Sequence, residues 1–338
     1  MSNHVFSQDK DRESAYQLFI ASCSHGQMTV KNIARLGYQL MRKAKVHYHF
    51  FGNHSLFNNA LYLTFFSLNL PYEYKNKTYL NRKITTDEAV KIIHLFERRI
   101  AERIPVEYIT QETYYLGNQF YVNQNVLVPR SLMSTQFKDF LDKVEWENYR
   151  VLDLCTGSGC IGITLALLKP NIKVDLVDIS SKALAVAEIN VKRFSLENRV
   201  SCIQSDLFEN IKDKYDLIIT NPPYVTESEY QLQPLEVKNE PKIALTAGTD
   251  GLDILNKILS ESALHLNPRG LLIAEVGYAG AVNIKKKYPR LPVQWLKCKG
   301  APEVRSIIYN LAEILVKYTS YLDSIFICKA RELKGPPI

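Results

Sequence analysis

Residues 151–160 read Val151-Leu152-Asp153-Leu154-Cys155-Thr156-Gly157-Ser158-Gly159-Cys160. The short apolar run at the start of this stretch is typical of a buried strand, and the residues after it favour a helix that runs toward Leu168. Gly157 and Gly159 allow the backbone to turn sharply and to approach a ligand closely. Together with Gly162 they form Gly-x-Gly-x-x-Gly, which alone is a weak indication of a dinucleotide site. The stretch therefore predicts a strand, a glycine loop and a helix, with a ligand at the loop.

Strands and helices alternate from Arg150 onward. Amphipathic or loop segments separate seven candidate strands: Val151–Leu154, Lys173–Asp178, Val200–Gln204, Leu217–Thr220, Leu271–Val276, Val293–Leu296 and Ile325–Cys328. This alternation predicts an α/β fold with a mostly parallel, doubly wound sheet. Such sheets bind ligands at the carboxyl ends of their strands, so the residues directly after the strands are the candidate site.

Three acidic residues follow successive predicted strands. Asp153 lies four positions before the first glycine, where a carboxylate suits the amino-acid end of S-adenosylmethionine better than a pyrophosphate. Asp178 can accept both hydroxyl groups of a ribose. Asp206, in Ser205-Asp206-Leu207-Phe208, can accept from an adenine amino group while Leu207 packs on the adenine face. Each acid alone could be a turn or a helix cap, and Asp178 alone does not distinguish this cofactor from NAD. Their joint position after successive strands favours a ligand site, and Asp153 favours a sulfonium cofactor without phosphate.

Asn221-Pro222-Pro223-Tyr224 follows the apolar run 216–220. The two prolines fix φ and remove two backbone donors, so the local carbonyls can face a ligand. The side-chain oxygen of Asn221 and the carbonyl of Pro222 can accept from a planar NH2 group, and Tyr224 offers a flat face to it. We therefore expect Asn221 and Pro222 to be catalytic and Pro223 and Tyr224 to bind substrate. An ordinary strand-ending turn is the alternative.

In combination these motifs resemble the class I S-adenosylmethionine-dependent methyltransferases, and more closely the protein-(glutamine-N5) methyltransferases. The segment from Glu240-Pro241 to Gly251-Leu252 is similar to the loop after that family's catalytic strand. The resemblance implies a Rossmann-like seven-stranded sheet, with S-adenosyl-L-methionine as cofactor. It implies these cofactor-binding residues: Asp153, Cys155, Thr156, Gly157, Ser158, Gly159, Asp178, Asp206, Leu207 and Asn221.

Two branches of this family act on different translation proteins, either class I release factors or the third protein of the large ribosomal subunit. Val128-Pro129-Arg130-Ser131 is similar to the ribosomal branch, as is the glycine loop with Cys155, where the release-factor branch usually has glycine. This resemblance implies that Arg130 binds substrate. Leu132 and Thr135 depart from the usual proline and glutamate of the ribosomal branch, and a segment near 301–324, expected to be helical, precedes the last strand. Release-factor methylation is therefore the alternative.

The chain divides into three predicted parts: residues 1–110, a helical substrate-recognition domain; residues 111–130, a connecting β-hairpin; and residues 131–338, the methyltransferase domain. Thr85 and Glu88 form a capping box at the start of a helix. Apolar residues recur at helical spacing after it, and the opposite face is expected to expose Arg98, Arg99 and Arg103 to solvent. Aromatic residues on both sides of Gly117-Asn118 predict the hairpin.

The composition, with 46% hydrophobic and 23% charged residues among 338, is ordinary for a soluble globular protein. The net charge of +7 fits contact with RNA or a ribosome, and also fits many enzymes that touch neither. Six scattered cysteines without a Cys-x-x-Cys pair predict reduced thiols and a cytoplasmic location. No stretch has the length and apolarity of a membrane span, and the first residues lack the apolar core of a signal peptide.

Two further functions stay open. A nucleic-acid adenine or guanine amino-methyltransferase would use the same Asn-Pro-Pro-aromatic chemistry, with residues 72–83, Lys285–Lys287 and Arg290 as a basic surface, but no target-recognition domain is evident. A non-catalytic ribosome- or RNA-binding relative would fit the changes after Ser131, although the intact tetrapeptide at Asn221 argues against it. His47, His49 and His54 lack a convincing further ligand, so no metal is expected.

Overall fold

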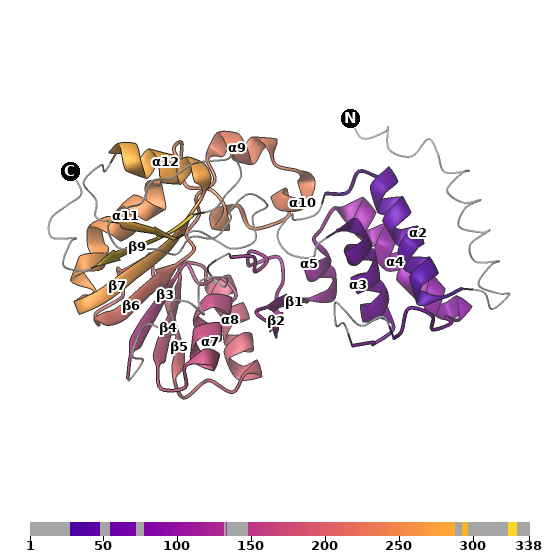
Figure 1. Ribbon diagram of the computed structural model, residues 1–338, viewed down its shortest axis with the longest axis horizontal. Coiled ribbons are helices and arrows are strands. Elements are labelled where there is room, and N and C mark those ends of the chain that lie inside the picture. The colour runs from indigo at the N-terminus through magenta and orange to yellow at the C-terminus, as the bar shows by residue number, and fades with distance from the viewer. Residues whose placement is uncertain are drawn as a thin grey trace. The chain divides into compact units, whose positions relative to one another are not determined.

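The computed structural model describes residues 28–47, 55–71, 78–131, 133, 148–287, 293–296 and 324–329, with only the backbone course for the last two ranges (Figure 1). The chain divides into two compact units, Met1–Thr110 and Gln111–Ile338. Several sequence predictions lie outside the described residues. These concern Leu132, Thr135, His49, His54, Arg290, the residues 72–77 and the segment 301–323.

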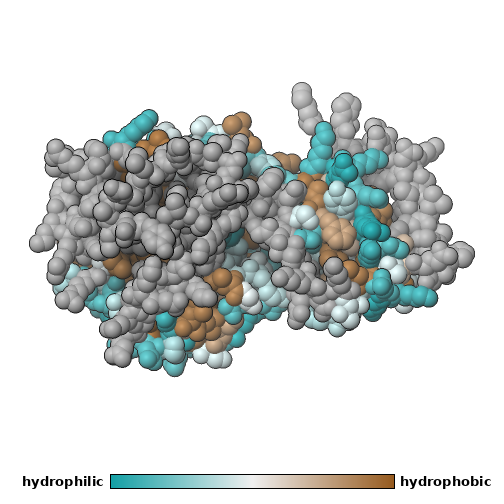
Figure 2. All heavy atoms as spheres, viewed as in Figure 1, coloured by the Kyte–Doolittle hydropathy of each residue, from teal (hydrophilic) through white to brown (hydrophobic). Residues whose placement is uncertain are grey.

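The first unit consists of helices α2 (Val30–Lys43), α3 (Leu56–Ser67), α4 (Thr86–Glu102) and α5 (Val106–Thr110) within the described residues. Thr29, Ser55 and Thr85 cap the first three with their side-chain oxygens, and the capping box of Thr85 and Glu88 is confirmed. The side of α2 that is visible in Figure 2 is hydrophilic, while the buried face of α2 packs on α3 and α4. A hydrophobic core therefore holds this unit together.

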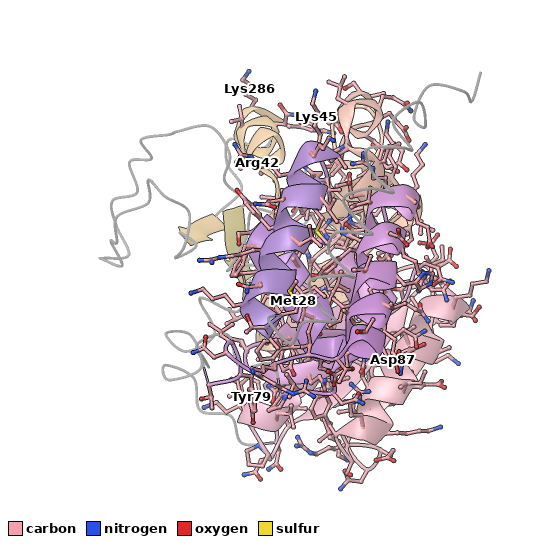
Figure 3. The ribbon with its side chains drawn as sticks, turned by 90° about the vertical axis from the view of Figure 1, so that its right-hand side faces the viewer. Met28, Arg42, Lys45, Tyr79, Asp87 and Lys286 are labelled. Carbon is pink, nitrogen blue, oxygen red and sulfur yellow. The ribbon has the colours of Figure 1, made fainter. Side chains whose placement is uncertain are left out.

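Helices α2 and α4 run in the same direction, with Met28 and Asp87 near one end of the unit and Arg42 and Lys45 near the other (Figure 3). The C-cap residue of α4, Arg103, binds carbonyls at the C-cap of α2 and directly after it. Arg103 donates to the oxygens of Ala44 (2.6 Å) and Lys45 (3.1 Å). Such donors are what the end of a helix needs, because its last carbonyls have no partner within the helix.

The prediction that Arg99 is solvated is wrong. Its side chain is 2% exposed, and its Nη2 atom donates to the carbonyl of His47 at 2.6 Å. The side chain of Arg98, in contrast, is 38% exposed and pairs with Glu102 one turn later. The helical period places both arginines near the polar edge, and the packing of the chain at His47 over α4 decides which one is covered.

The second unit begins with an antiparallel hairpin of β1 (Glu112–Tyr115) and β2 (Asn118–Tyr121). The predicted hairpin is confirmed, with its turn shifted by one residue to Leu116 and Gly117. Both residues have positive φ, 47° and 80°, as a tight two-residue turn between twisted strands requires. This hairpin leads directly into the segment 122–131.

A seven-stranded sheet forms the centre of the second unit, with the order β5-β4-β3-β6-β7-β9-β8. Strands β3 to β7 are mutually parallel, and β9 is antiparallel to both of its neighbours. The strands are β3 (Arg150–Leu154), β4 (Lys173–Asp178), β5 (Val200–Gln204), β6 (Tyr215–Thr220), β7 (Leu266–Val276), β8 (Val293–Leu296) and β9 (Ser324–Lys329). The predicted α/β fold with its Rossmann-like sheet is confirmed.

Helices cover both faces of this sheet (Figure 1). Helices α7 (Cys160–Leu168) and α8 (Ser181–Arg193) pack on the face that carries Asp153 and Val174. The other face, with Leu152 and Leu154, shares a core with α11 (Asp253–Glu261) and α12 (Tyr278–Lys287). Short helices α9 (Glu227–Leu232) and α10 (Leu235–Lys238) and the 3₁₀ turn η1 (Lys242–Ala244) follow β6, and a second 3₁₀ turn, η2 (Ser262–Leu264), follows α11.

Gly162 allows α7 to approach the sheet closely. A Cβ atom at this position would lie 2.5 Å from Leu176 and 3.0 Å from both Val174 and Asp153. We expect Gly162→Ala to lower the free energy of unfolding by about 1–3 kcal/mol, because extra volume in a packed core forces its neighbours apart. Urea or thermal unfolding measures the loss. Gly280→Ala in α12 is the matched control, since its Cβ would meet neighbours at an ordinary 3.5 Å, and an equal loss there would contradict the explanation.

Candidate active site

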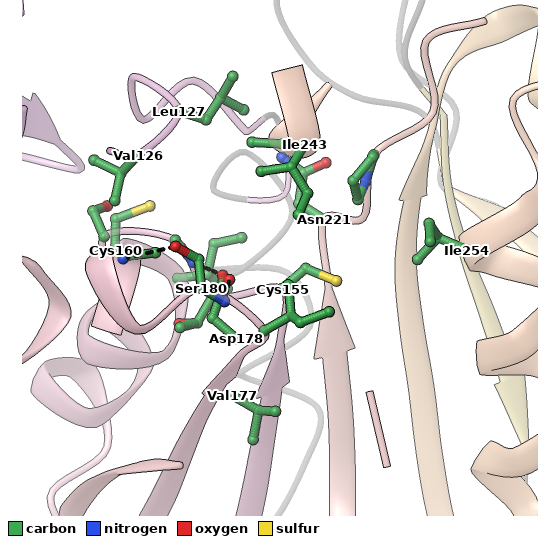
Figure 4. Close-up of a pocket in the computed structure, with 18 of the residues that line it drawn as sticks. Val126, Leu127, Cys155, Cys160, Val177, Asp178, Ser180, Asn221, Ile243 and Ile254 are labelled. Atoms are coloured by element: carbon green, nitrogen blue, oxygen red, sulfur yellow. Dashed lines mark hydrogen bonds between the residues drawn. The ribbon is translucent and has the colours of Figure 1, made fainter. Parts of the chain in front are cut away.

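A pocket lies at the carboxyl ends of β3, β4, β5 and β6, where the strand order of the sheet reverses (Figure 4). This is the position at which doubly wound sheets bind their ligands. Ten of the residues predicted for the site line the pocket: Arg130, Cys155, Thr156, Gly157, Ser158, Asp178, Asp206, Leu207, Asn221 and Pro223. Eight of these ten residues follow the ends of three separate strands, β3, β5 and β6, while Asp178 ends β4 itself, and Arg130 comes from the segment after the hairpin.

The glycine loop alternates into the left-handed region of backbone conformation. The φ angles are 57° at Cys155, 57° at Gly157 and 80° at Gly159. The amide of Thr156 donates to the carbonyl of Val177 at 3.0 Å, and that of Gly159 donates to Thr156 at 2.9 Å. Glycine adopts positive φ without the strain that a Cβ brings, so the two glycines permit this loop, while Cys155 bears that strain.

Asp153 lies beneath the glycine loop and is fully buried. Its Oδ2 accepts from the hydroxyl of Thr156 (2.7 Å) and the amide of Gly162 (2.9 Å), while Oδ1 has no hydrogen-bond partner among the described residues. Burial raises the pKa of Asp153 to about 7, although the hydrogen bonds from Thr156 and Gly162 oppose the rise. The carboxyl group therefore holds the glycine loop and the start of α7 through these two hydrogen bonds. Its direct contact with a ligand remains a prediction.

Asp178 stands at the end of β4 and faces the pocket (Figure 4). Its Oδ2 accepts from the amide of Gly157 at 2.9 Å, and its Oδ1 accepts from the amide of Ser180 at 3.0 Å. Burial raises the pKa of Asp178, and these backbone N–H groups oppose the rise. Each carboxylate oxygen has further lone pairs available, so the group can hold the glycine loop and accept from a ligand at the same time.

The turn after β5 brings Asp206 and Leu207 to the pocket. Leu207 has a φ of 49°, which is unusual for a residue with a Cβ. Asn210 stabilises this turn, because its amide donates to the hydroxyl of Ser205 and its side chain donates to the carbonyl of Gln204, both at 2.9 Å. The conformation of the turn places a carboxylate and an aliphatic side chain next to each other at the pocket wall.

Asn221 follows β6 and presents an acceptor that lacks a partner. Its Oδ1 atom is buried and has no hydrogen bond with any described residue, although Asn221 lines the pocket. An unsatisfied buried acceptor costs on the order of 1–3 kcal/mol. A ligand that brings a donor would offset this cost, so the binding role predicted for Asn221 is compatible with the position of this atom and stays a prediction.

The other three residues of the tetrapeptide differ in whether they line the pocket. Pro223 lines the pocket, whereas Pro222 and Tyr224 are not among the lining residues. The ring of Tyr224 lies against Gly277 at the end of β7, where a Cβ atom would be 2.9 Å from it. The amides of Tyr224 and Val225 both donate to the carbonyl of Leu245, at 3.2 and 2.8 Å. The backbone after Asn221 is therefore fixed by the loop that follows it.

Arg130 lines the pocket as part of the segment that crosses from the hairpin. Its Nη1 contacts both carboxylate oxygens of Glu240, at 2.9 and 2.7 Å, and Glu240 also accepts from the amide of Val128 at 3.1 Å. Next to it, the hydroxyl of Ser131 donates to Glu275 at 2.6 Å. Two buried carboxylates thus hold the segment 128–131, and contact of Arg130 with a substrate remains a prediction.

Comparison with known proteins agrees with this geometry. Residues 133–237 match the family described as the methyltransferase small domain. The ribosomal protein uL3 glutamine methyltransferase of Neisseria meningitidis serogroup B is 38% identical over 277 residues, which cover 80% of this chain and 90% of that protein. The Neisseria gonorrhoeae protein of the same name is also 38% identical, over 80% of this chain and 91% of its own length.

The chain belongs to the family of the ribosomal protein uL3 glutamine methyltransferases. The resemblance inferred from the motifs is thereby confirmed. Among solved structures, a methyltransferase from Pyrococcus furiosus is 17% identical, with a TM-score of 0.42 over 70% of this chain and 95% of that one.

In this uL3 methyltransferase family member, sequence reasoning missed one wall of the pocket. Residues 125–128 line it, as do Ile243 and Ile254 (Figure 4). Ile243 lies within the segment Glu240–Leu252, which the resemblance included, so that segment was a signal for it. In the wall formed by 125–128, only Val128 belongs to a motif that the resemblance included. The other three residues carried no signal, because they are mostly apolar and the hairpin that positions them is distant from the glycine loop in sequence.

Other site types find no support among the described residues. No group of three or more histidine, cysteine or acidic side chains in this part of the chain could hold a metal ion. Within the same residues, no helix combines the length and the apolarity that crossing a bilayer demands. Cys155, Cys160 and Cys202 are free thiols, and burial raises the pKa of all three above its ordinary value.

Proposed function

We propose that this chain transfers the methyl group of S-adenosyl-L-methionine to the side-chain amide nitrogen of a glutamine in ribosomal protein uL3. The observation that carries the proposal is the unpartnered Oδ1 atom of Asn221, which is buried at the pocket beside Pro223. A primary amide supplies the N–H donor that this acceptor lacks. The names of the relatives support uL3 as the protein that carries the amide.

The pocket fits the chemistry of this cofactor. Asp178 has lone pairs left for two ribose hydroxyls after accepting from Gly157 and Ser180. Asp206 offers an acceptor for an adenine amino group beside Leu207, whose side chain offers an apolar surface to the ring. Asp153 holds the loop above it and keeps one oxygen unpaired. When bound, the cofactor supplies a methyl group on a positively charged sulfur.

The residues directly after β6 can compensate for the low nucleophilicity of a glutamine amide nitrogen. A glutamine amide nitrogen reacts poorly because its lone pair is delocalised into the carbonyl group. Asn221 Oδ1 and the carbonyl of Pro222 would accept from the two amide hydrogens, which stabilises positive charge that develops on the nitrogen. Because two prolines fix the backbone and Leu245 binds the next two amides, the backbone that carries these acceptors is held in place before the substrate arrives. Water takes the proton that the nitrogen loses.

One feature of the chain outside the pocket enters the proposal. The helical unit that ends at Thr110 is the proposed substrate-recognition domain. We also infer a cytoplasmic location, where ribosomal proteins are synthesised. Contact with ribosomal RNA is compatible with this location but is not required for the chemistry. Release factors are the second candidate substrate, since they carry the same reactive group.

The test is transfer of a labelled methyl group. The purified chain is incubated with labelled cofactor and, in separate reactions, with unmethylated uL3, unmethylated release factors and ribosomal RNA. We expect a mass gain of one methyl on a single glutamine of uL3, located by peptide mass spectrometry. Label in RNA, with none in protein, would establish nucleic-acid amino-methylation instead. Bound cofactor without transfer to any of the three would indicate a non-catalytic relative.

A further inference from the structure

Asn190, in the last turns of α8, is a buried polar residue that the proposed chemistry does not use. Its exposed fraction is 0%, and it is not among the residues that line the pocket. Its side chain nevertheless touches two segments that are distant in sequence. One is Tyr121, at the end of the hairpin, and the other is Ser158, in the glycine loop.

Three hydrogen bonds define this contact. The Oδ1 atom of Asn190 accepts from the amide of Tyr121 at 2.7 Å, and Nδ2 donates to the carbonyl of the same residue at 3.0 Å. The second hydrogen of Nδ2 goes to the carbonyl of Ser158 at 2.9 Å. The side chain thus binds both the N–H and the C=O group of Tyr121, as the backbone of a neighbouring strand would. It also binds the carbonyl of Ser158 in the glycine loop.

Only a primary amide fits this set of partners. One backbone N–H requires an acceptor, and two backbone carbonyls require two donors from a single atom, which is the inventory of asparagine. A carboxylate of the same shape would place an oxygen at 2.9–3.0 Å from two carbonyl oxygens. Buried polar atoms need their partners, so the identity of residue 190 is tied to the positions of both segments.

Both segments continue directly into walls of the pocket. Ser158 lines the pocket itself, and the neighbouring Gly157 binds Asp178 through its amide. From Tyr121 the chain reaches the lining residue Asn125 in four steps, and the steps between are fixed by local bonds. Asn123 accepts from the amide of Asn125 at 2.9 Å and donates to the hydroxyl of Tyr121 at 3.3 Å. A displacement at Tyr121 is therefore passed on to the wall formed by 125–128.

We propose that Asn190 is a positioning residue that sets the separation of two walls of the cofactor pocket, the glycine loop and the segment 125–128. It acts on the cofactor through the backbone of these segments and does not touch the cofactor. The identity of the cofactor rests on the proposed function. The link that Asn190 forms between Tyr121 and Ser158, here called the clamp, rests on the three hydrogen bonds. Loss of the clamp weakens cofactor binding and leaves the reacting groups at Asn221 in place.

The decisive variant is Asn190→Asp, which keeps the shape and the acceptor and removes both donors. We expect its dissociation constant for S-adenosylhomocysteine, measured by calorimetry, to rise at least about tenfold, equivalent to about 1.4 kcal/mol. The KM for the methyl donor should rise by a similar factor, while kcat at saturating donor should change by less than about threefold. In the protein without ligand, hydrogen exchange should increase together at the amides of residues 121–128 and 156–159.

The matched control is Asn59→Asp in the helical unit. Asn59 is also buried, at 5% exposure, and its side chain donates to the carbonyl of Ser55 at 3.4 Å. This control should lower the melting temperature and leave the affinity for S-adenosylhomocysteine within about twofold. If Asn190→Asp does not fold, Asn190→Ser, which introduces no charge, is measured in the same way.

The outcomes separate the two proposals. If the wild-type protein fails to bind S-adenosylhomocysteine, the proposed function is overturned and the cofactor role of Asn190 with it. If the wild type binds and the Asn190 variant binds equally well with a lowered melting temperature, the residue is merely structural and only this inference is overturned. Exchange that increases at 121–128 without any change at 156–159 would likewise overturn the clamp.

Discussion

Asn221→Ala lowers kcat at least about a hundredfold while cofactor affinity stays within about threefold of the wild type; this is the largest effect we expect. The substitution removes the side-chain oxygen that lies buried and unpartnered at the pocket. Removing one preorganised group that stabilises developing charge typically costs a factor of about 10²–10³ in kcat. The backbone bonds of Tyr224 and Val225 to Leu245 do not involve this side chain, so the local fold should persist.

Turnover is measured with saturating cofactor and unmethylated uL3, and affinity is measured with S-adenosylhomocysteine. Asn198→Ala is the matched control, because Asn198 is exposed and precedes β5 at the end of the strand opposite the pocket. We expect this control to keep wild-type kcat. Near-normal turnover of the Asn221 variant would remove Asn221 from the mechanism and leave the tetrapeptide as a rigid turn.

Asp178→Ala should weaken binding of S-adenosylhomocysteine by at least about a hundredfold. Hydrogen bonds to a charged group contribute about 1.5–3 kcal/mol each, and this carboxylate has capacity for two from a ribose. The substitution also takes away the acceptor of the Gly157 amide, which lies 2.9 Å from Asp178 Oδ2. Because the glycine loop depends on this bond, its loss adds to the loss of the direct contacts.

The comparison variant is Asp175→Ala, three positions earlier on the same strand. Asp175 accepts from Ser201 at 2.6 Å, from Tyr215 at 2.9 Å and from Arg150 at 3.1 Å, so its loss should reduce stability and leave cofactor affinity unchanged. Calorimetry is carried out at a temperature where both variants are folded. Equal affinity of the Asp178 variant and the wild type would rule out a ribose contact at this position.

Local patterns predicted most of the elements because their causes are local. Seven apolar runs became seven strands, and Thr85 with Glu88 began the helix that their spacing indicates. The turn differed from expectation by one residue, because Leu116 and not Asn118 takes positive φ beside Gly117, although asparagine adopts that conformation more readily than leucine. The solvent-exposed position expected for Arg99 was wrong for a different reason, because a segment more than 50 residues away covers it.

The residues of the functional site also divide into those that local sequence patterns predicted and those that they did not. Asp178, Asp206 and Asn221 could be found because polar residues directly after apolar strands are visible in a linear reading, and a parallel sheet must bring them to one edge. Linear reading could not find three other features: the pair of Arg130 with Glu240, the wall at 125–128 and the contacts of Asn190. Their partners are separated by up to 112 residues, and no periodic pattern links them.

The amino-acid sequence alone was enough to specify the strands, the glycine loop, the family and the chemical groups offered to a ligand, because each of these depends on residue type and short-range spacing. The tertiary structure alone decided which buried acceptor is left without a partner and which side chains hold the pocket walls apart. Burial and hydrogen-bond pairing depend on distances between segments that are far apart along the chain, and folding is the step that sets those distances.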